Sequence, residues 1–229
     1  MKRENSSSTW NSYWGNNYNQ DRKNQYRQFL QSLSQTETLG RTLIDVGCGL
    51  YPVTSELSDL RHRKIYLDIS QGIQNQINDE SNLFVQTDLH RLLENNHRDF
   101  KRYMKKICRF VGNEELENSR SGFKPSLSSF ADSIVYSDII NYIDYQQVFK
   151  RMYQFLKIGG RKIIFNKINM GIYELLSDKR PKSNWELLMF LQKNLRMVIE
   201  YRHAMPLILG DHDEIDRAVY ILIARKISL

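Results

Sequence analysis

The 229-residue sequence predicts an α/β fold with a doubly wound, mostly parallel sheet of seven strands, in which the last strand is antiparallel. Three observations lead to this prediction. Short apolar runs alternate with helix-length segments, one apolar run leads directly into a glycine turn, and the last two apolar runs are joined without a helix. The alternation is typical of βαβ units, whose sheet is covered by helices on both faces. With 41% hydrophobic residues, a chain of this length can bury one substantial core.

The N-terminal 20 residues are polar but contain four aromatic residues at helical spacing. These are Trp10, Tyr13, Trp14 and Tyr18. Disordered tails rarely carry this much aromatic surface, so we expect the segment to dock on the protein core or on a ligand. The following segment, Asp21–Leu33, has the apolar periodicity of a helix. Residues 1–38 are therefore predicted to form a helical, aromatic cover, and residues 39–229 the main domain.

Five apolar runs are predicted to be parallel strands, because each is short and is followed by polar or amphipathic sequence. They are Thr42–Val46, Lys64–Leu67, Leu83–Gln86, Ser133–Tyr136 and Lys162–Phe165. A helix over Asn184–Lys193 then leads to two further strands, Met197–Tyr201 and Ala218–Ala224. Since no helix separates these two strands, we expect an antiparallel pair at the end of the sheet.

The segment between the third and fourth strands, Leu89–Phe130, has about forty residues and exceeds the usual crossover. Residues 96–130 are predicted to be an insertion, which begins with an amphipathic basic helix over Arg98–Val111 and continues as a polar loop. The stretch Arg98–Arg109 has six basic residues and one acidic residue, so it carries five of the seven excess positive charges of the chain. Such a face is usually solvated, and a nucleic-acid partner is the less favoured interpretation.

The composition argues against several classes of protein. No apolar run approaches the roughly 20 residues that a membrane span needs, and Met1–Gln20 lacks the apolar centre of a signal peptide. Cys48 and Cys108 have no companions at zinc-site spacing and are too few for a disulfide framework. We therefore expect a cytoplasmic protein with reduced thiols, no metal site and no membrane contact.

The sharpest motif is a predicted strand that runs into Gly47-Cys48-Gly49. Glycines allow a tight turn and a close approach to a ligand, and the helical stretch expected after Pro52 would offer its N-terminal N–H groups to an anion. The third glycine of a dinucleotide fingerprint would fall at Pro52, and no phosphate-loop motif is found. An NAD-dependent oxidoreductase is therefore disfavoured, while an ordinary tight turn stays an alternative.

Three acids fall at three successive strand ends, namely Asp45, Asp68 and Asp88. Asp68 lies nineteen residues after Gly49, where an acid can accept the hydroxyl protons of a ribose. Each acid alone could be a helix N-cap. Because ligands of open α/β sheets bind at the carboxyl ends of the strands, the three acids together predict a binding site at this edge.

These motifs resemble those of the class I S-adenosylmethionine-dependent methyltransferases. Asp45–Gly49 is similar to the family's glycine motif, Asp68 to its ribose-binding acid, and Asp88-Leu89 to the pair that contacts adenine. Ser133–Asp138 is similar to the fourth strand, and Leu156–Arg161 to the turn before the fifth, with Ile158 where proline is usual. The resemblance covers roughly residues 40–168 by motif. It implies a Rossmann-like fold with S-adenosyl-L-methionine as cofactor.

The resemblance also implies particular site residues. The expected cofactor-binding residues are Tyr13, Tyr18, Asp45, Gly47, Cys48, Gly49, Tyr51, Asp68, Ile69, Asp88, Leu89 and Ser137. Asp138 and Tyr142 follow the fourth strand and are the catalytic candidates. Aromatic rings near the methyl group suit a cationic sulfonium, although core packing explains each ring equally well.

A narrower resemblance links the chain to small-amine N-methyltransferases such as the nicotinamide and phenylethanolamine enzymes. It rests on Gly40–Gly49, which lacks a third glycine at Tyr51, and on Tyr13–Tyr18, which is similar to a segment that covers cofactor and substrate in that group. The later, substrate-facing segments do not match, so we do not extend the amine substrates of that group to this chain.

The expected activity is methyl transfer to an oxygen or nitrogen atom of a small-molecule or natural-product acceptor. The alternatives are an RNA or peptide methyltransferase and a non-catalytic RNA-binding module on the same fold. The sequence does not assign the oligomeric state.

Overall fold

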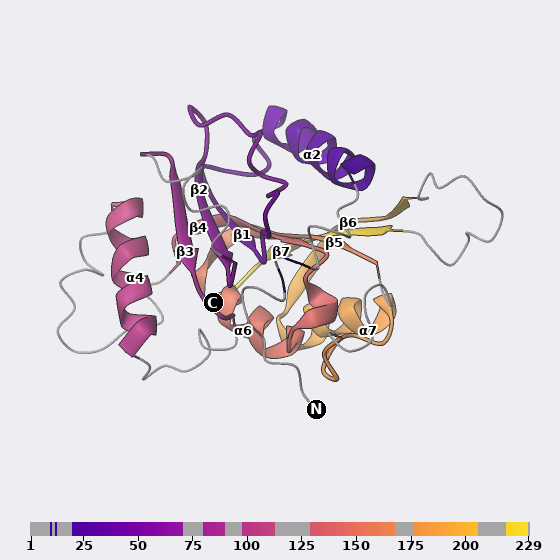
Figure 1. The fold of residues 1–229 in the computed structure, drawn as a ribbon. Helices are drawn as coiled ribbons and strands as arrows, with labels where there is room; N and C mark the ends of the chain where they lie inside the picture. The colour runs from indigo at the N-terminus through magenta and orange to yellow at the C-terminus, as the bar shows by residue number, and fades with distance from the viewer. Residues whose placement is uncertain are drawn as a thin grey trace.

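A computed structural model describes residues 10, 12, 20–70, 80–89, 98–112, 129–167, 176–205 and 219–228. Within these residues, one seven-stranded sheet has the order β3-β2-β1-β4-β5-β7-β6 (Figure 1). Its strands are β1 (Thr42–Val46), β2 (Arg63–Asp68), β3 (Asn82–Gln86), β4 (Ala131–Ser137), β5 (Leu156–Asn166), β6 (Met197–Met205) and β7 (Val219–Lys226). The first five strands, β1 to β5, are parallel to one another, and β7 is antiparallel to both β5 and β6. The predicted sheet is therefore confirmed.

The order of the strands reverses between β1 and β4, which lie side by side in the middle of the sheet. From β1 the chain builds outwards through β2 to β3, and it then returns to add β4 and β5 on the other side. In open α/β sheets a ligand binds outside the carboxyl ends of the strands at such a switch point. The topology alone thus directs attention to the segments that follow β1 and β4.

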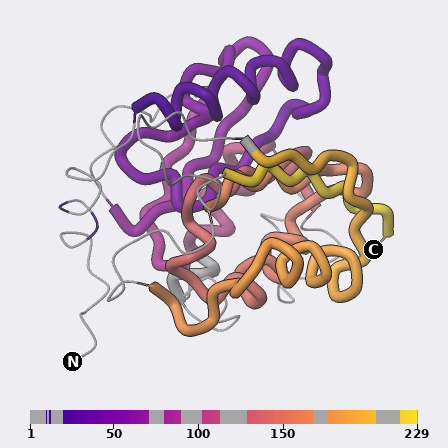
Figure 2. The backbone as a smooth tube through the Cα atoms, turned by 90° about the vertical axis from the view of Figure 1, so that its right-hand side faces the viewer, coloured from indigo at the N-terminus to yellow at the C-terminus, as the bar shows by residue number. Residues whose placement is uncertain are grey.

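Helices cover the two faces of the sheet unequally (Figures 1 and 2). The helices are α2 (Gln20–Gln35), α4 (Arg98–Val111), α6 (Tyr145–Phe155) and α7 (Asn184–Met189), with a 3-10 turn η3 (Ile140–Tyr142) and a π turn η5 (Phe190–Asn194). One face packs on α2 through Tyr26 and Leu30, and the other packs on α4, α6 and α7. No helix in the described ranges has both the length and the apolar character needed to cross a bilayer.

The predicted basic helix is present as α4, close to β3 at the sheet edge (Figure 1). Its apolar face buries Met104, Ile107 and Cys108 in the core that includes the neighbouring strands. The Lys106 ammonium donates to the backbone oxygen of Phe84 in β3 at 2.9 Å. The loop predicted after this helix lies outside the described residues.

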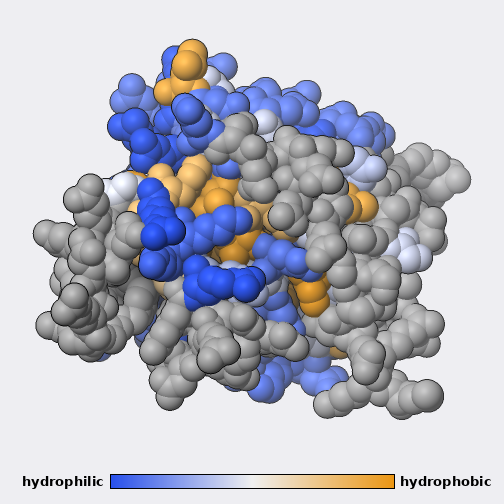
Figure 3. Space-filling model, turned by 60° about the vertical axis from the view of Figure 1, so that its left-hand side comes forward, coloured by the Kyte–Doolittle hydropathy of each residue, from blue (hydrophilic) through white to orange (hydrophobic). Residues whose placement is uncertain are grey.

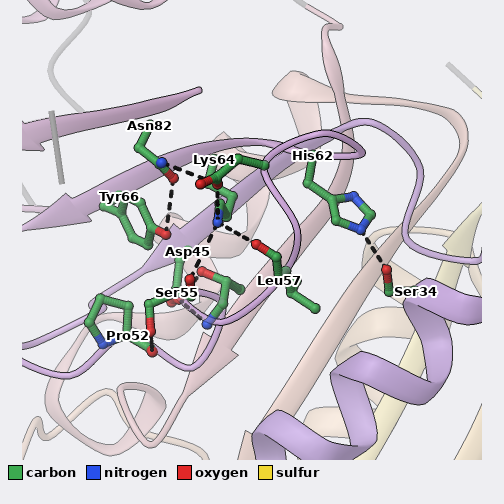
Figure 4. Close-up of polar contacts among 11 residues, drawn as sticks. Ser34, Asp45, Pro52, Ser55, Leu57, His62, Lys64, Tyr66 and Asn82 are labelled. Atoms are coloured by element: carbon green, nitrogen blue, oxygen red, sulfur yellow. Dashed lines mark hydrogen bonds and ion pairs between the residues drawn. The ribbon is translucent and has the colours of Figure 1, made fainter. Parts of the chain in front are cut away.

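The prediction of a helix after Pro52 is wrong, because residues 50–61 form a series of turns. Lys64 in β2 points into these turns, where its ammonium donates to the backbone oxygen of Leu57 at 2.7 Å and pairs with Asp59 at 2.6 Å (Figure 4). The Arg61 N–H, which would donate to the Leu57 carbonyl in a helix, donates instead to the Ser58 carbonyl at 3.2 Å. His62 joins the turns to α2 by a 2.7 Å hydrogen bond with Ser34 (Figure 4). The segment directly after the glycine turn therefore supplies no helix N-terminus.

Candidate functional site

The glycine turn that follows β1 places two glycines in the left-handed region, with φ of 65° at Gly47 and 64° at Gly49. The two positions differ in their surroundings. A Cβ atom on Gly47 would lie 2.3 Å from Cγ1 of Ile139, whereas a Cβ atom on Gly49 would meet nothing within 4 Å. Gly47 therefore lets β1 pack closely against the segment after β4, and Gly49 borders open space.

The carboxylate of Asp68, at the end of β2, connects two loops. Its Oδ2 accepts from the Gly49 N–H at 2.8 Å, and its Oδ1 accepts from the Ser70 N–H at 2.7 Å. Burial raises the pKa of Asp68, and these backbone hydrogen bonds oppose the shift. The side chain is thus fixed at the edge of the sheet beside the glycine turn.

A cavity that is partly open to solvent lies at this edge. Its lining residues are Trp10, Gly47, Asp68, Ile69, Thr87, Asp88, Leu89, Ile139, Tyr142 and Ile143. The residues at the carboxyl ends of β2 and β3 make one part of the lining polar, with two carboxylates and a hydroxyl. The residues that follow β4, together with Trp10, make the other part apolar and aromatic. The cavity therefore suits a ligand that has a polar and an apolar portion.

The cavity brings together five of the expected cofactor-binding residues and one of the two catalytic candidates. The five are Gly47, Asp68, Ile69, Asp88 and Leu89, and the catalytic candidate is Tyr142. Tyr13 and Tyr18 lie outside the described residues. Gly49 donates to Asp68 from the turn itself, while Cys48 is buried and Tyr51 is about half exposed without lining the cavity.

Asp45 also lies outside the lining, because its side chain is turned towards the segment after the glycine turn. Its Oδ2 accepts from the Thr54 hydroxyl at 2.8 Å, and burial raises the pKa of Asp45 to about 6. Asp45 thus holds the turns over residues 50–61 against β1.

Asp138 is engaged by three side chains of α2. The Tyr26 hydroxyl donates to its Oδ1 at 3.1 Å, and the cationic groups of Arg22 and Lys23 lie 3.3 and 3.4 Å from its Oδ2. Lys23 also donates to the Ser137 hydroxyl at 2.5 Å. Burial lowers the pKa of Lys23, and the Asp138 charge opposes this shift. Ser137 and Asp138 therefore dock α2 on the end of β4 and do not line the cavity.

Four lining residues were not among those expected from the sequence. They are Trp10, Thr87, Ile139 and Ile143. Trp10 belongs to the N-terminal aromatic series and meets Tyr142 edge to face, with ring centroids 5.1 Å apart. That series was the available signal for Trp10, whereas the two isoleucines carry no chemical signature. Within the described residues, no group of three or more His, Cys, Asp or Glu side chains could hold a metal ion.

No protein-family model and no curated protein sequence matches the chain. Its fold, however, is shared with many solved structures. One is the N-methyltransferase NodS from Bradyrhizobium japonicum WM9 in complex with S-adenosylhomocysteine, which is 11% identical, with a TM-score of 0.61 over 97% of this chain and 99% of that one. Another is the Burkholderia thailandensis 1,6-didemethyltoxoflavin-N1-methyltransferase with bound 1,6-didemethyltoxoflavin and S-adenosylhomocysteine. It is 13% identical, with a TM-score of 0.60 over 94% of this chain and 81% of that one.

A third is the CurJ carbon methyltransferase, at 14% identity with a TM-score of 0.57. The match covers 90% of this chain but 54% of CurJ, so the chain spans about half the length of that structure. At these identities the similarities establish the fold. The chain has the Rossmann-like fold of the S-adenosylmethionine-dependent methyltransferases, as its motifs led us to expect.

Proposed function

We propose that the chain is an S-adenosylmethionine-dependent methyltransferase that methylates an oxygen or nitrogen atom of a small-molecule or natural-product acceptor. The observation that carries this proposal is the cavity at the switch point of the sheet, bordered by the glycine turn and by two acids at the ends of successive strands. Two of the similar structures hold S-adenosylhomocysteine, which is the product form of this cofactor.

The residues present fit this cofactor. Gly49 borders open space, so the backbone can be approached closely there, and Asp68 is held where a ribose hydroxyl would need an acceptor. Asp88 and Leu89 line the same part of the cavity and are suited to contact a purine. When bound, the cofactor would supply a methyl group on a sulfonium, which needs no metal for transfer.

In this proposal, the apolar part of the cavity receives the acceptor. Trp10, Ile139 and Ile143 exclude water from it, and Tyr142 presents an aromatic ring and a hydroxyl. Exclusion of water and alignment of the two reactants supply most of what a displacement at a sulfonium requires. Because Asp138 is engaged by α2, we assign it a positioning role rather than that of a general base.

The direct test is isothermal titration calorimetry with S-adenosylhomocysteine. We expect micromolar binding to the wild type and weaker binding to Asp68→Asn, since the amide oxygen replaces only part of the carboxylate's acceptor capacity. Asp178→Asn, at an exposed position, is the matched control and should bind as the wild type does. No binding to the wild type would refute the proposal, and equal binding to Asp68→Asn would refute the ribose assignment.

The exposed face of α4 favours one second candidate, in which the acceptor is RNA. Arg102, Lys105, Lys106 and Arg109 are all exposed on this helix. Figure 3 brings this side of the molecule forward, and its described surface is largely hydrophilic, with hydrophobic residues visible between the hydrophilic ones. A salt titration of RNA binding would test this candidate, because contacts to phosphates weaken steeply as salt rises. Binding that Lys105→Gln leaves unchanged would argue against a role for α4.

A further inference from the structure

Asp138, the first residue after β4, has an uncommon backbone conformation. Its φ is 59°, in the left-handed region that few residues other than glycine adopt, although aspartate enters it more readily than most. Its N–H donates to the backbone oxygen of Phe165 in β5 at 2.9 Å. A residue in this region carries a conformational cost and stays there only where the surrounding structure holds it. The contacts of Asp138 therefore decide whether this conformation persists.

Tyr26 of α2 connects the side chain of Asp138 to the same strand that receives its N–H. The Tyr26 hydroxyl donates to Oδ1 of Asp138 at 3.1 Å, and the Tyr26 ring stacks on Phe165 with ring planes 18° apart. Both aromatic side chains are completely buried. Burial and the Asp138 charge hold the pKa of Tyr26 well above its ordinary value, so the hydroxyl keeps its proton and is the donor. Asp138 is thus fixed through its backbone by Phe165 and through its side chain by Tyr26.

The next residue, Ile139, forms a wall of the cavity against the glycine turn. A Cβ atom on Gly47 would lie 2.3 Å from Cγ1 and 2.6 Å from Cδ1 of Ile139, so this side chain occupies the space directly beside the turn. Ile139 and Gly47 both line the cavity. A change of φ at Asp138 would alter the direction in which the chain leaves β4 and would move Ile139 with it. The conformation of Asp138 therefore sets the shape of this wall.

We propose that Tyr26 is a positioning residue for the cavity wall, because its hydroxyl holds Asp138 in the left-handed conformation that seats Ile139 against Gly47. Tyr26 is not among the described residues that line the cavity, so it would act on a bound ligand only through this route. Without the hydroxyl, Asp138 can relax towards a more common φ, and Ile139 is no longer fixed beside the turn. The expected effect on cofactor affinity rests on the proposed function, whereas the placement of Ile139 does not.

The first test is calorimetry with S-adenosylhomocysteine on Tyr26→Phe and on the matched control Tyr153→Phe. Each variant loses one tyrosine hydroxyl and keeps its ring, and the Tyr153 hydroxyl, near the end of α6, donates to the backbone oxygen of Ser228 at 2.8 Å. We expect Tyr26→Phe to bind at least about fivefold more weakly than the wild type and Tyr153→Phe to bind within about twofold of it. Thermal unfolding verifies that both variants are folded at the temperature of the titration.

A double-mutant cycle tests the route through Ile139. If Tyr26 acts by seating this side chain, then Tyr26→Phe should change the affinity of the Ile139→Ala variant by less than about twofold. A general structural role of Tyr26 would instead give the same loss of affinity in both backgrounds.

The placement of Ile139 can also be measured without any ligand, from the signal of its δ1 methyl group in ¹H–¹³C NMR. The signal is assigned by its absence in Ile139→Ala. It should shift or broaden in Tyr26→Phe and stay unchanged in Tyr153→Phe.

Three outcomes would overturn the inference. These are an unchanged Ile139 signal in Tyr26→Phe, wild-type affinity of Tyr26→Phe for S-adenosylhomocysteine, and an equal loss of affinity in the wild-type and Ile139→Ala backgrounds. Absence of S-adenosylhomocysteine binding to the wild type would refute the proposed function instead. The methyl signal alone would then decide whether Tyr26 positions the wall.

Discussion

Lys162, in the middle of β5, is a fully buried amine with no acidic partner among the described residues. Its ammonium nitrogen donates to the Tyr136 hydroxyl and to the backbone oxygen of Phe149, both at 2.9 Å, and it lies over the rings of both residues. Burial holds the pKa of Lys162 well below its ordinary value, because desolvation disfavours the charged form. The residue therefore makes the stability of the protein depend on pH.

The sign of this dependence follows from proton binding. Between the lowered pKa of folded Lys162 and its ordinary value of about 10.4, the unfolded chain binds one more proton, so the free energy of unfolding rises with pH. The slope from one such group is at most about 1.4 kcal/mol per pH unit. We expect the double variant Lys162→Met/Tyr136→Phe to flatten the slope between neutral pH and the onset of tyrosine ionisation. Urea unfolding at several pH values across this range measures the slope.

The double variant removes both partners of the hydrogen bond, so it leaves no tyrosine hydroxyl unpaired at this contact. Part of the slope should persist, because burial also lowers the pKa of Lys226. Lys150→Met removes an exposed positive charge from α6 and is the matched control. A slope in the double variant as steep as in the wild type would show that Lys162 is not the group that titrates.

The two glycines after β1 allow a paired prediction. Gly47→Ala combines a left-handed φ with a Cβ atom 2.3 Å from Ile139, so it should lower the free energy of unfolding by about 2–5 kcal/mol. Gly49→Ala carries the strain of its φ alone and should cost about 1–2 kcal/mol. Its methyl group would nevertheless occupy space that the cofactor is proposed to approach. In urea unfolding, Gly47→Ala should therefore be the less stable variant, whereas in calorimetry with S-adenosylhomocysteine Gly49→Ala should be the weaker binder. If one variant were the more impaired in both measurements, this assignment would be contradicted.

At the scale of elements, α2 is attached to the sheet by apolar packing and by a buried charge cluster. Tyr26 stacks on Phe165 with ring centroids 4.5 Å apart, and its hydroxyl reaches Asp138. Arg22 and Lys23 face the same carboxylate. Asp138 itself adopts a left-handed φ of 59°, which asparagine tolerates as well as aspartate does. The contribution of its charge can therefore be isolated by an isosteric substitution.

Asp138→Asn leaves two buried cations opposite a neutral amide. Removing one partner from a buried ion pair typically costs about 3–5 kcal/mol, and we expect a loss of this size in the free energy of unfolding. Glu56→Gln, in which the exposed Glu56 pairs with Arg27, is the control and should change stability by less than about 1 kcal/mol. Urea unfolding distinguishes the two variants. A small effect of Asp138→Asn would mean that α2 is held by its apolar stripe alone.

The sequence predicted most elements but not all of them. The strands could be predicted because each is a short apolar run, and α2 and α4 because each has an apolar face at helical spacing. The turns over residues 50–61 could not be predicted, because they depend on Lys64 in β2 reaching back to the Leu57 carbonyl. A lysine is ordinarily expected at the surface, and nothing in the local sequence pattern indicates that its ammonium bonds a backbone oxygen.

For the whole molecule, the candidate site was predictable where glycines and acids mark strand ends. Gly47, Asp68 and Asp88 were identified in this way, and the cavity brings them together. Ile139 could not be identified, since only the alignment of β1 with β4 places it against Gly47. Asp45 shares its motif with Gly47, yet its side chain turns to Thr54. Motifs thus located the site along the chain, while the direction of each side chain required the fold.

The choice of cofactor can be tested on the whole molecule by thermal unfolding. A ligand that binds only the folded chain stabilises it by about 2.7 kcal/mol at about a hundred times its Kd. For a chain of this size, we expect S-adenosylhomocysteine to raise the Tm by about 5–10 °C under that condition. NAD should leave the Tm unchanged, because Pro52 stands where the dinucleotide fingerprint requires its third glycine. Stabilisation by NAD together with no response to S-adenosylhomocysteine would reverse the assignment of the cavity, whereas the expected pair of results would identify its ligand before any acceptor is known.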